Sequence, residues 1–262
     1  RTRTWEQKSK PIDIKEANTQ LLFTKHSELF EEYWKTCLLL GRAPAKDEFS
    51  KADELIELVG TMKKAFRLCL NFYGNDNFAI AQQMRTEDLL VYFAVGHFGQ
   101  RKPYKYQPEQ TKRDIKAFFD TNKNAQTLAK ELLFQIADVE MIEAECLEAH
   151  NNLPKSVLAK EFEKPHSLTF HKQYLDLLSP LLRVYVSSAL QLYGELEDIQ
   201  LIKIHINSGK LTLLGYANFE ESNSPTLKER VKIKMADQDV DFFDYIDEHS
   251  DAVLSNKSDY IC

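Results

Sequence analysis

Hydrophobic positions follow helical spacing over most of the chain and change to strict alternation near its end. Apolar residues three and four apart predict helices over residues 12–40, 50–59, 62–70, 78–84, 86–97, 111–136, 138–150 and 172–193. The helix over 111–136 is expected to bend near residues 120–124, and the last is bent or restarted at Ser179 and Pro180. Residues 168–170 are a short strand candidate. Alternating apolar and polar residues predict one β-hairpin from 200–206 and 210–216, and a second from 231–235 and 239–245.

This order of elements predicts an α+β fold that is mainly α. We expect an N-terminal helical bundle with a helix-turn-helix-like segment, then a small antiparallel sheet with a covering helix. Asn151, Asn152 and Pro154 interrupt the helical pattern, so a domain boundary is expected there. The expected regions are a linker-like start at 1–20, a helical domain at 21–152 and an α+β domain with two β-hairpins at 153–262. The polar, basic start at Arg1 favours a piece of a longer protein.

Residues 38–70 contain two abrupt breaks between short helical patterns. Gly41 and Gly60 are expected to end helices, because glycine tolerates the left-handed conformation of a helix C-terminus. Ser50 and Thr61 are expected to cap the helices that follow. Short helices joined by glycine-containing turns are typical of a helix-turn-helix-like module, whose recognition helix carries phosphate contacts. The candidate contacts here are Lys63, Lys64 and Arg67. The alternative is an ordinary bundle with a solvated basic face.

A second basic segment lies where two prolines interrupt the helical pattern. Lysines and arginines occur there beside tyrosines, and cations interleaved with aromatic rings suit a nucleic-acid backbone with stacked bases. The candidate DNA contacts in this segment are Arg101, Lys102, Tyr104, Lys105, Tyr106, Lys112 and Arg113. The alternative is a solubilising loop before a helix.

Composition limits the class of protein. The chain has 262 residues, of which 43% are hydrophobic, and this is enough for a sizeable core. The net charge of -6 argues against a wholly basic nucleic-acid protein but allows local basic patches. The 4 cysteines lie far apart, which favours a reduced, cytoplasmic location. No apolar run approaches about 20 residues, so no membrane span is expected.

Motifs for catalysis are weak. Gly96 and Gly99 follow a predicted helix rather than a strand, so a nucleotide or S-adenosylmethionine pocket of the usual kind is not expected. Four acids between 237 and 248 have the spacing of a calcium loop, but Phe242 stands where its sharp turn needs glycine. The histidines lack a second ligand at a suitable spacing. We therefore expect no cofactor, no metal site and no catalytic residue in this chain alone.

Several short blocks occur in an order that matches a known family. They are Gly41-Arg42-Ala43-Pro44 with Glu48-Phe49, His171, and the stretches 92–98, 114–119, 132–134, 180–185, 201–205, 214–219 and 225–227. In order and spacing they resemble the region that follows the catalytic domain in methyltransferases associated with DNA phosphorothioation. The likeness spans about residues 33–245. It has two departures: residues 251–258 lack the proline, histidine and arginine usual there, and Ser224 stands where a histidine is often found.

The resemblance implies a part in bacterial gene clusters that replace a phosphate oxygen of DNA by sulfur, in modification and defence. The S-adenosylmethionine-binding domain of that family finds no counterpart in these residues. We therefore expect a non-catalytic DNA-recognition or accessory module, with DNA, plain or phosphorothioated, and a methyltransferase domain or other proteins of the cluster as partners. The alternative is a protein-interaction scaffold of the same system without direct DNA contact. A standalone hydrolase or metal enzyme is a third hypothesis, and it needs convergent His, Asp or Glu residues.

Overall fold

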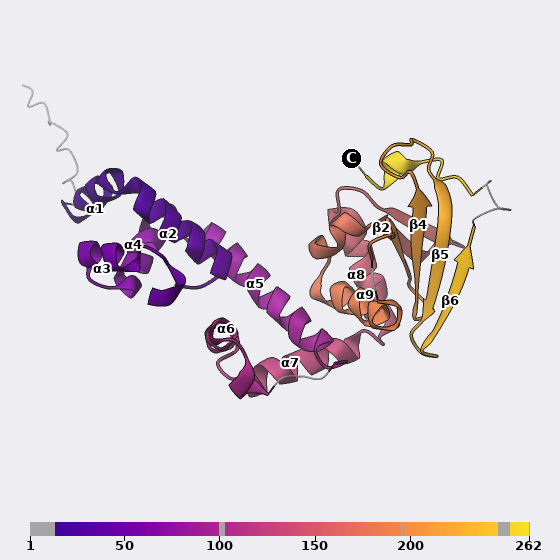
Figure 1. Cartoon of the computed structure of the whole chain (residues 1–262), viewed down its shortest axis with the longest axis horizontal. Coiled ribbons are helices and arrows are strands. Elements are labelled where there is room, and N and C mark those ends of the chain that lie inside the picture. Colours follow the sequence, from indigo (N-terminus) through magenta and orange to yellow (C-terminus); the bar gives the residue numbers. More distant parts are fainter. Residues whose placement is uncertain (1–13, 100–102, 195, 246–251, 262) are drawn as a thin grey trace, which may run out of the picture. The chain divides into compact units, whose positions relative to one another are not determined.

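The chain divides into two compact units, residues 1–87 and 88–262, which we call the first and the second unit. The computed structural model describes residues 14–99, 103–194, 196–245 and 252–261 (Figure 1). Over these residues each unit has its own hydrophobic core. The first unit is helical and the second contains the sheet, so the expected α+β class, mainly α, is confirmed.

The first unit is a bundle of helices around aromatic and sulfur-containing side chains. Its helices are α1 Ile14–Lys25, α2 Ser27–Leu40, α3 Ala52–Val59, α4 Met62–Tyr73 and the start of α5 Asp76–Val95, with a 3₁₀ turn, η1, at Lys46–Glu48. Phe30, Tyr33 and Cys37 of α2 are fully buried with Cys69 of α4. The Tyr33 hydroxyl donates to the carbonyl of Met62 at 3.0 Å, which ties α2 to the start of α4.

The helix ends in this unit follow local sequence signals. Gly41 has a φ of 63° and ends α2, and its N–H donates to the carbonyl of Leu38. Gly60 ends α3, and the Thr61 hydroxyl caps α4 by accepting the N–H of Lys64 at 3.1 Å. These predictions are confirmed, and the expected order of helix, turn and helix is present as α3 and α4. The predicted cap at Ser50 is wrong, because the chain makes a further turn at 50 and 51 before α3 begins.

The two helices predicted over 78–84 and 86–97 form the single helix α5. Thr86, with two acids after it, has the composition of a helix start. Its hydroxyl instead donates to the carbonyl of Gln82, one turn earlier, at 2.8 Å. A threonine hydroxyl can satisfy itself in this way inside a helix, so it does not interrupt α5.

The region 111–136, predicted as one helix with a bend, is two helices. They are α6 Glu109–Phe119 and α7 Asn122–Gln135. Asp120 between them has a φ of 60°, which no helical residue adopts, and the Thr121 hydroxyl caps α7 by accepting the N–H of Asn124. The next helix, α8 Val139–Asn152, begins after Asp138 as predicted, since that carboxylate accepts two backbone N–H groups.

Beside these helices, the second unit contains one antiparallel sheet. Over the described residues, its six strands are neighbours in the order in which they occur along the chain. They are β1 Val157–Glu161, β2 Lys164–His171, β3 Leu201–His205, β4 Lys210–Ala217, β5 Thr226–Lys234 and β6 Asp239–Asp244. Both predicted hairpins are confirmed as β3–β4 and β5–β6. The sequence did not predict β1, nor that β4 pairs with β5 to join the hairpins into one sheet.

Helices cover one face of this sheet. Between β2 and β3 the chain forms a 3₁₀ segment, η3 Lys172–Leu177, and then α9 Pro180–Tyr193, so the expected restart at Ser179 and Pro180 is confirmed. Figure 1 shows α8 and α9 packed on the same face of the sheet. One core joins Ile142 of α8, Leu182 of α9 and Ile204 of β3. The predicted boundary at 152/153 therefore falls inside the second unit. None of the described helices is long and apolar enough to cross a membrane.

Candidate nucleic-acid interface

The first predicted site is a small basic patch on α4 in the first unit. Lys63, Lys64 and Arg67 are exposed, and their spacing of three and four residues puts them on one side of the helix. No ion pair engages any of them over the residues that the structure describes. The helix before it, α3, exposes Asp53, Glu54 and Glu57, so the basic surface in this segment is confined to α4.

The second predicted site falls in the second unit, and part of it lies outside the described residues. Arg101 and Lys102 are in that part. Tyr104, Lys105 and Tyr106 form an exposed 3₁₀ turn, η2 Tyr104–Tyr106, in which the Lys105 ammonium lies 4.5 Å from the centre of the Tyr106 ring. This cation and this ring are therefore within cation–π range of one another.

The remaining two predicted contacts are on α6. The Lys112 ammonium pairs with the carboxylate of Glu109 at 2.6 Å. Arg113 is half-buried next to the fully buried Asp114, and it already has an interaction within the protein. Because these two cations have partners, they are less available to a ligand than the exposed lysines of α4.

A larger basic surface lies on the face of the sheet turned away from α8 and α9, which we call the open face. The strand register places side chains of this face in rows that cross β2 to β6. The first row is Ser167, His205, Lys210, Lys234 and Asp239; the second is Thr169, Lys203, Thr212, Lys232 and Asp241; the third is His171, Leu201, Leu214, Arg230 and Phe243. The residues between them, such as Ile202, Leu213 and Val231, belong to the core under the helices.

The cations of the open face fall into two groups. Lys234 is neutralised, since its ammonium lies 2.9 Å from a carboxylate oxygen of Asp239 and 2.9 Å from one of Asp241. The others form no ion pair with any described residue, and we call them the basic cluster. The basic cluster consists of Lys203, Lys210, Arg230 and Lys232.

Titration behaviour indicates a positive electrostatic potential around the basic cluster. Partial burial, and then the charge of Arg230, lower the pKa of Lys203. The pKa of His205 falls to about 4, first because the ring is partly buried and then because Lys203, His166, Lys232 and Lys210 repel a further proton. His205 is therefore neutral at pH 7, and its Nε2 lies 2.9 Å from the hydroxyl of Thr212.

Sequence reasoning missed the basic cluster although its signal is visible. In the predicted strand 200–206 Lys203 alternates with apolar residues, and in 231–235 Lys232 and Lys234 do the same, so each lysine must lie on the polar face of its strand. To see that the two faces are the same one requires the pairing of β4 with β5, which places Lys203, Thr212 and Lys232 side by side. That pairing joins segments about 20 residues apart, and the sequence of neither hairpin predicts it.

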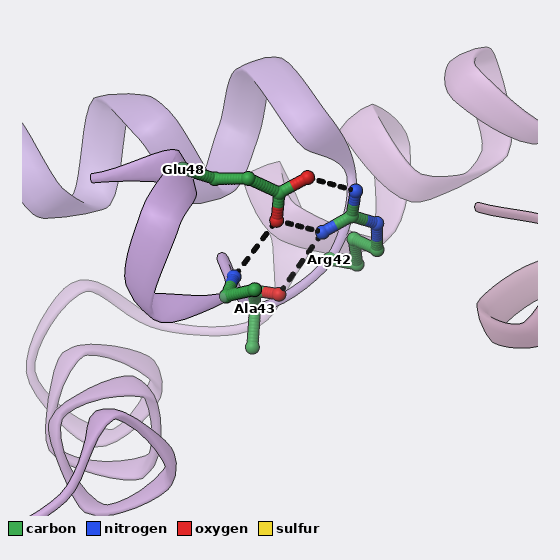
Figure 2. Close-up of polar contacts among 4 residues, drawn as sticks. Arg42, Ala43 and Glu48 are labelled. Atoms are coloured by element: carbon green, nitrogen blue, oxygen red, sulfur yellow. Dashed lines mark hydrogen bonds and ion pairs between the residues drawn. The ribbon is translucent and has the colours of Figure 1, made fainter. Parts of the chain in front are cut away.

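The block Gly41-Arg42-Ala43-Pro44 with Glu48 has a structural role. Figure 2 shows the Arg42 guanidinium and the Glu48 carboxylate joined by two parallel contacts, each 2.7 Å. Glu48 also accepts the N–H of Ala45 at 2.8 Å. The side chains of Arg42 and Glu48 are only 7% and 12% exposed. This ion pair fixes the connection between α2 and α3 and presents little charge to a ligand.

The second unit also has an apolar pocket of about 480 Å³ between the turn after α7, α9 and the β3–β4 and β5–β6 turns. Its walls include Ile142, Ile206 and Met235, and Tyr185 is the one titratable residue in its lining. A pocket without a second acid or base does not offer proton-transfer chemistry. Over the described part of the chain, no three His, Cys, Asp or Glu side chains are grouped so as to hold a metal ion. Cys37, Cys69 and Cys146 are buried free thiols.

The chain matches no family model, no curated protein and no solved structure.

Proposed function

We propose that this chain is a non-catalytic nucleic-acid-recognition module that binds phosphates on the open face of its sheet. The observation that supports this function is the basic cluster, in which four cations on β3, β4 and β5 form no ion pair with any described residue, although Asp241 is the cross-strand neighbour of Lys232. Phosphate oxygens are the common ligands that neutralise such a group. The sequence resemblance favours DNA as the nucleic acid and a DNA-modification system as the setting, with the chain as its recognition or accessory part.

The expected mechanism is counterion release. Each phosphate neutralised by a lysine or arginine releases about 0.9 of a condensed cation from duplex DNA. If all four cations of the basic cluster engage phosphates, affinity falls roughly 100-fold between about 50 and about 200 mM salt. Such binding is electrostatic, and by itself it does not discriminate between base sequences.

The test is binding of a labelled DNA duplex to the whole chain over this range of salt. The variant Lys203→Gln with Lys232→Gln removes two phosphate contacts, so the logarithmic salt slope should become shallower by about 1.8. Lys234→Gln is the matched control, because Asp239 and Asp241 already neutralise that lysine. A slope unchanged in the double variant contradicts the proposal, and so does the absence of binding to both a duplex and a single strand at about 50 mM salt.

The α4 patch is tested separately as the recognition helix of a helix-turn-helix-like module. The triple variant Lys63→Gln, Lys64→Gln, Arg67→Gln keeps the helix propensity close to that of the native chain. A loss of affinity in this variant supports a DNA contact at α4. An unchanged affinity means that α4 does not contact DNA, and the open face is then the remaining proposed DNA-binding surface. A duplex that carries phosphorothioate in place of phosphate tests the link to sulfur modification, which tighter binding of that duplex would support.

A protein-interaction scaffold is the second candidate function. Ile80 and Met84 lie one turn apart on α5 and are 58% and 59% exposed. Neighbouring exposed apolar side chains are typical of a surface that contacts another protein. Two results together favour the scaffold: the native chain does not bind DNA, and the double variant Ile80→Ser with Met84→Ser no longer binds a partner protein that the native chain binds.

A further inference from the structure

The open face carries an aromatic ring directly beside the basic cluster. Arg230 on β5 and Phe243 on β6 are direct cross-strand partners. The guanidinium carbon of Arg230 lies 4.3 Å from the centre of the Phe243 ring and 6.0 Å from that of Tyr245. Phe243 remains 37% exposed, so one part of this ring packs on Arg230 and another part faces solvent. The neighbouring Phe242 is on the opposite face, where its ring lies 6.0 Å from Tyr193 of α9.

Arg230 has hydrogen-bonding capacity that the described protein does not use. Its Nε is buried, and it forms no hydrogen bond with any residue that the structure describes. A buried N–H donor without an acceptor costs about 1–3 kcal/mol, so such a group commonly has a ligand or water as its partner. Lys232 lies two residues along β5 on the same face, and the charge of Arg230 acts on Lys203, so an anionic oxygen is the favoured acceptor.

The spacing of these groups suits an extended chain of phosphates. Arg230 and Lys232 point to the same face two residues apart, which separates them by about 6.8 Å along β5. Lys203 and Lys232 lie two strands apart in one row, a separation of about 9.6 Å across the sheet. The cations therefore form a band over three strands, and Phe243 stands at its β6 side.

We propose that the open face binds single-stranded nucleic acid, with a phosphate at Arg230 and Lys203 and a base stacked on Phe243. Stacking on an exposed ring requires a base with a free π-face, which a single strand provides and an intact duplex does not. The described open face is also a sheet surface without a helix that enters a groove, whereas groove readers of duplex DNA insert a helix or a ribbon. This inference rests on the proposed phosphate-binding function and specifies its ligand.

The test compares a fluorescein-labelled oligo(dT) of about 12 nucleotides with a duplex of equal length in a fluorescence anisotropy titration of the whole chain. The single strand is expected to bind more tightly. Phe243→Leu should weaken single-strand binding roughly 5- to 100-fold, the loss that removal of one stacked base produces, and should weaken duplex binding less. Phe243→Tyr should restore the affinity, because it keeps the ring.

Phe242→Leu is the matched control, since it removes a neighbouring and more exposed ring from the other face of the same strand. It is expected to bind both ligands as the native chain does. Equal or tighter binding of the duplex, or equal affinities for Phe243→Leu and Phe242→Leu, overturns the stacking proposal. Salt-sensitive binding that still depends on Lys203 and Lys232 in that case leaves the proposed phosphate-binding function standing. No binding of either ligand at about 50 mM salt overturns both.

Discussion

The ion pair between Arg42 and Glu48 gives a quantitative prediction about the first unit. Glu48→Gln keeps the size of the side chain and an oxygen for the N–H of Ala45, but it removes the negative charge that Arg42 faces. The guanidinium then faces a neutral amide in place of this carboxylate, at a position that is only 7% exposed. A buried charge that loses its counter-charge is strongly unfavourable, because the protein no longer compensates for lost hydration.

The expected cost is set by burial and by the remaining hydrogen bonds. Breaking a buried ion pair from one side costs about 3–5 kcal/mol. The glutamine oxygen still accepts from Ala45 and from one guanidinium nitrogen, although its NH2 group then faces the other. Arg42 also keeps a further interaction within the protein, so we expect the lower end, about 3 kcal/mol. For a unit of this size, with an m value of about 1–1.5 kcal/mol per M urea, the midpoint of unfolding should fall by about 2–3 M.

Tryptophan fluorescence isolates this unit from the rest of the chain. The sequence has 2 tryptophans, Trp5 and Trp34, and both precede the division at Glu87. Trp34 is buried in the first core. A urea titration followed by tryptophan emission therefore reports the unfolding of the first unit, and the sheet of the second unit is followed separately by circular dichroism.

Asp53→Asn is the matched control for Glu48→Gln. Asp53 pairs with Lys46 at 2.5 Å, but those side chains are 84% and 63% exposed. An exposed pair contributes little, so this variant should lose less than about 0.5 kcal/mol. If the midpoint of Glu48→Gln moves no further than that of Asp53→Asn, the argument from burial is refuted.

Three further predictions concern local geometry and titration. Gly41→Ala should destabilise the first unit by about 2–4 kcal/mol in the same urea assay, because its φ is 63° and an added Cβ would lie 2.9 Å from the Cβ of Arg85. At Gly60 an added Cβ would meet no atom within 4 Å, so Gly60→Ala should cost only the backbone strain of its positive φ, about 1 kcal/mol. Asp138→Ala should cost the second unit about 1–2 kcal/mol by thermal unfolding, since two N–H groups of α8 lose their cap. The free energy of unfolding of the native chain should fall by about 1–2 kcal/mol, after allowance for solvent screening, as pH falls from about 6.5 to about 4, because the unfolded state binds a proton at His205 at a higher pH than the folded state does. The variant His205→Asn should lose correspondingly less stability over this range. Identical pH profiles of stability for the two proteins contradict this assignment.

Local signals in the sequence predicted helix ends well because the chemistry that ends a helix is local. Gly41 closes α2 and Thr61 opens α4 through bonds that span three residues. Asp138 does the same for α8. The failures at Ser50 and Thr86 have the same origin. A small hydroxyl can cap a helix or bond back within one, and only the path of the neighbouring chain decides between the two.

Tertiary pairing explains why the basic cluster escaped prediction. The patches expected from sequence, on α4 and around residue 104, are runs of charge that lie close together along the chain. The basic cluster is spread from Lys203 to Lys232, and its members meet only through the register of β3, β4 and β5. The alternation of apolar and polar residues predicts each strand. The order in which the strands lie beside one another depends on long-range packing of the whole sheet.

The sheet itself supplies the strongest argument that the basic cluster is functional. On β5 and β6 the cross-strand partners of a lysine are carboxylates, and Lys234 is neutralised by Asp239 and Asp241. On β4 the same geometry places Thr212, and not a carboxylate, between Lys203 and Lys232, and the Asp241 opposite Lys232 pairs with Lys234. Partial burial, and then the charge of Arg230, lower the pKa of Lys203, so the charged form of this lysine is unfavourable in the folded state. A phosphate chain bound across β3, β4 and β5 would supply negative charge to cations that form no ion pair, and this is why we propose the basic cluster, rather than the paired Lys234 of the same face, as the site of the ligand.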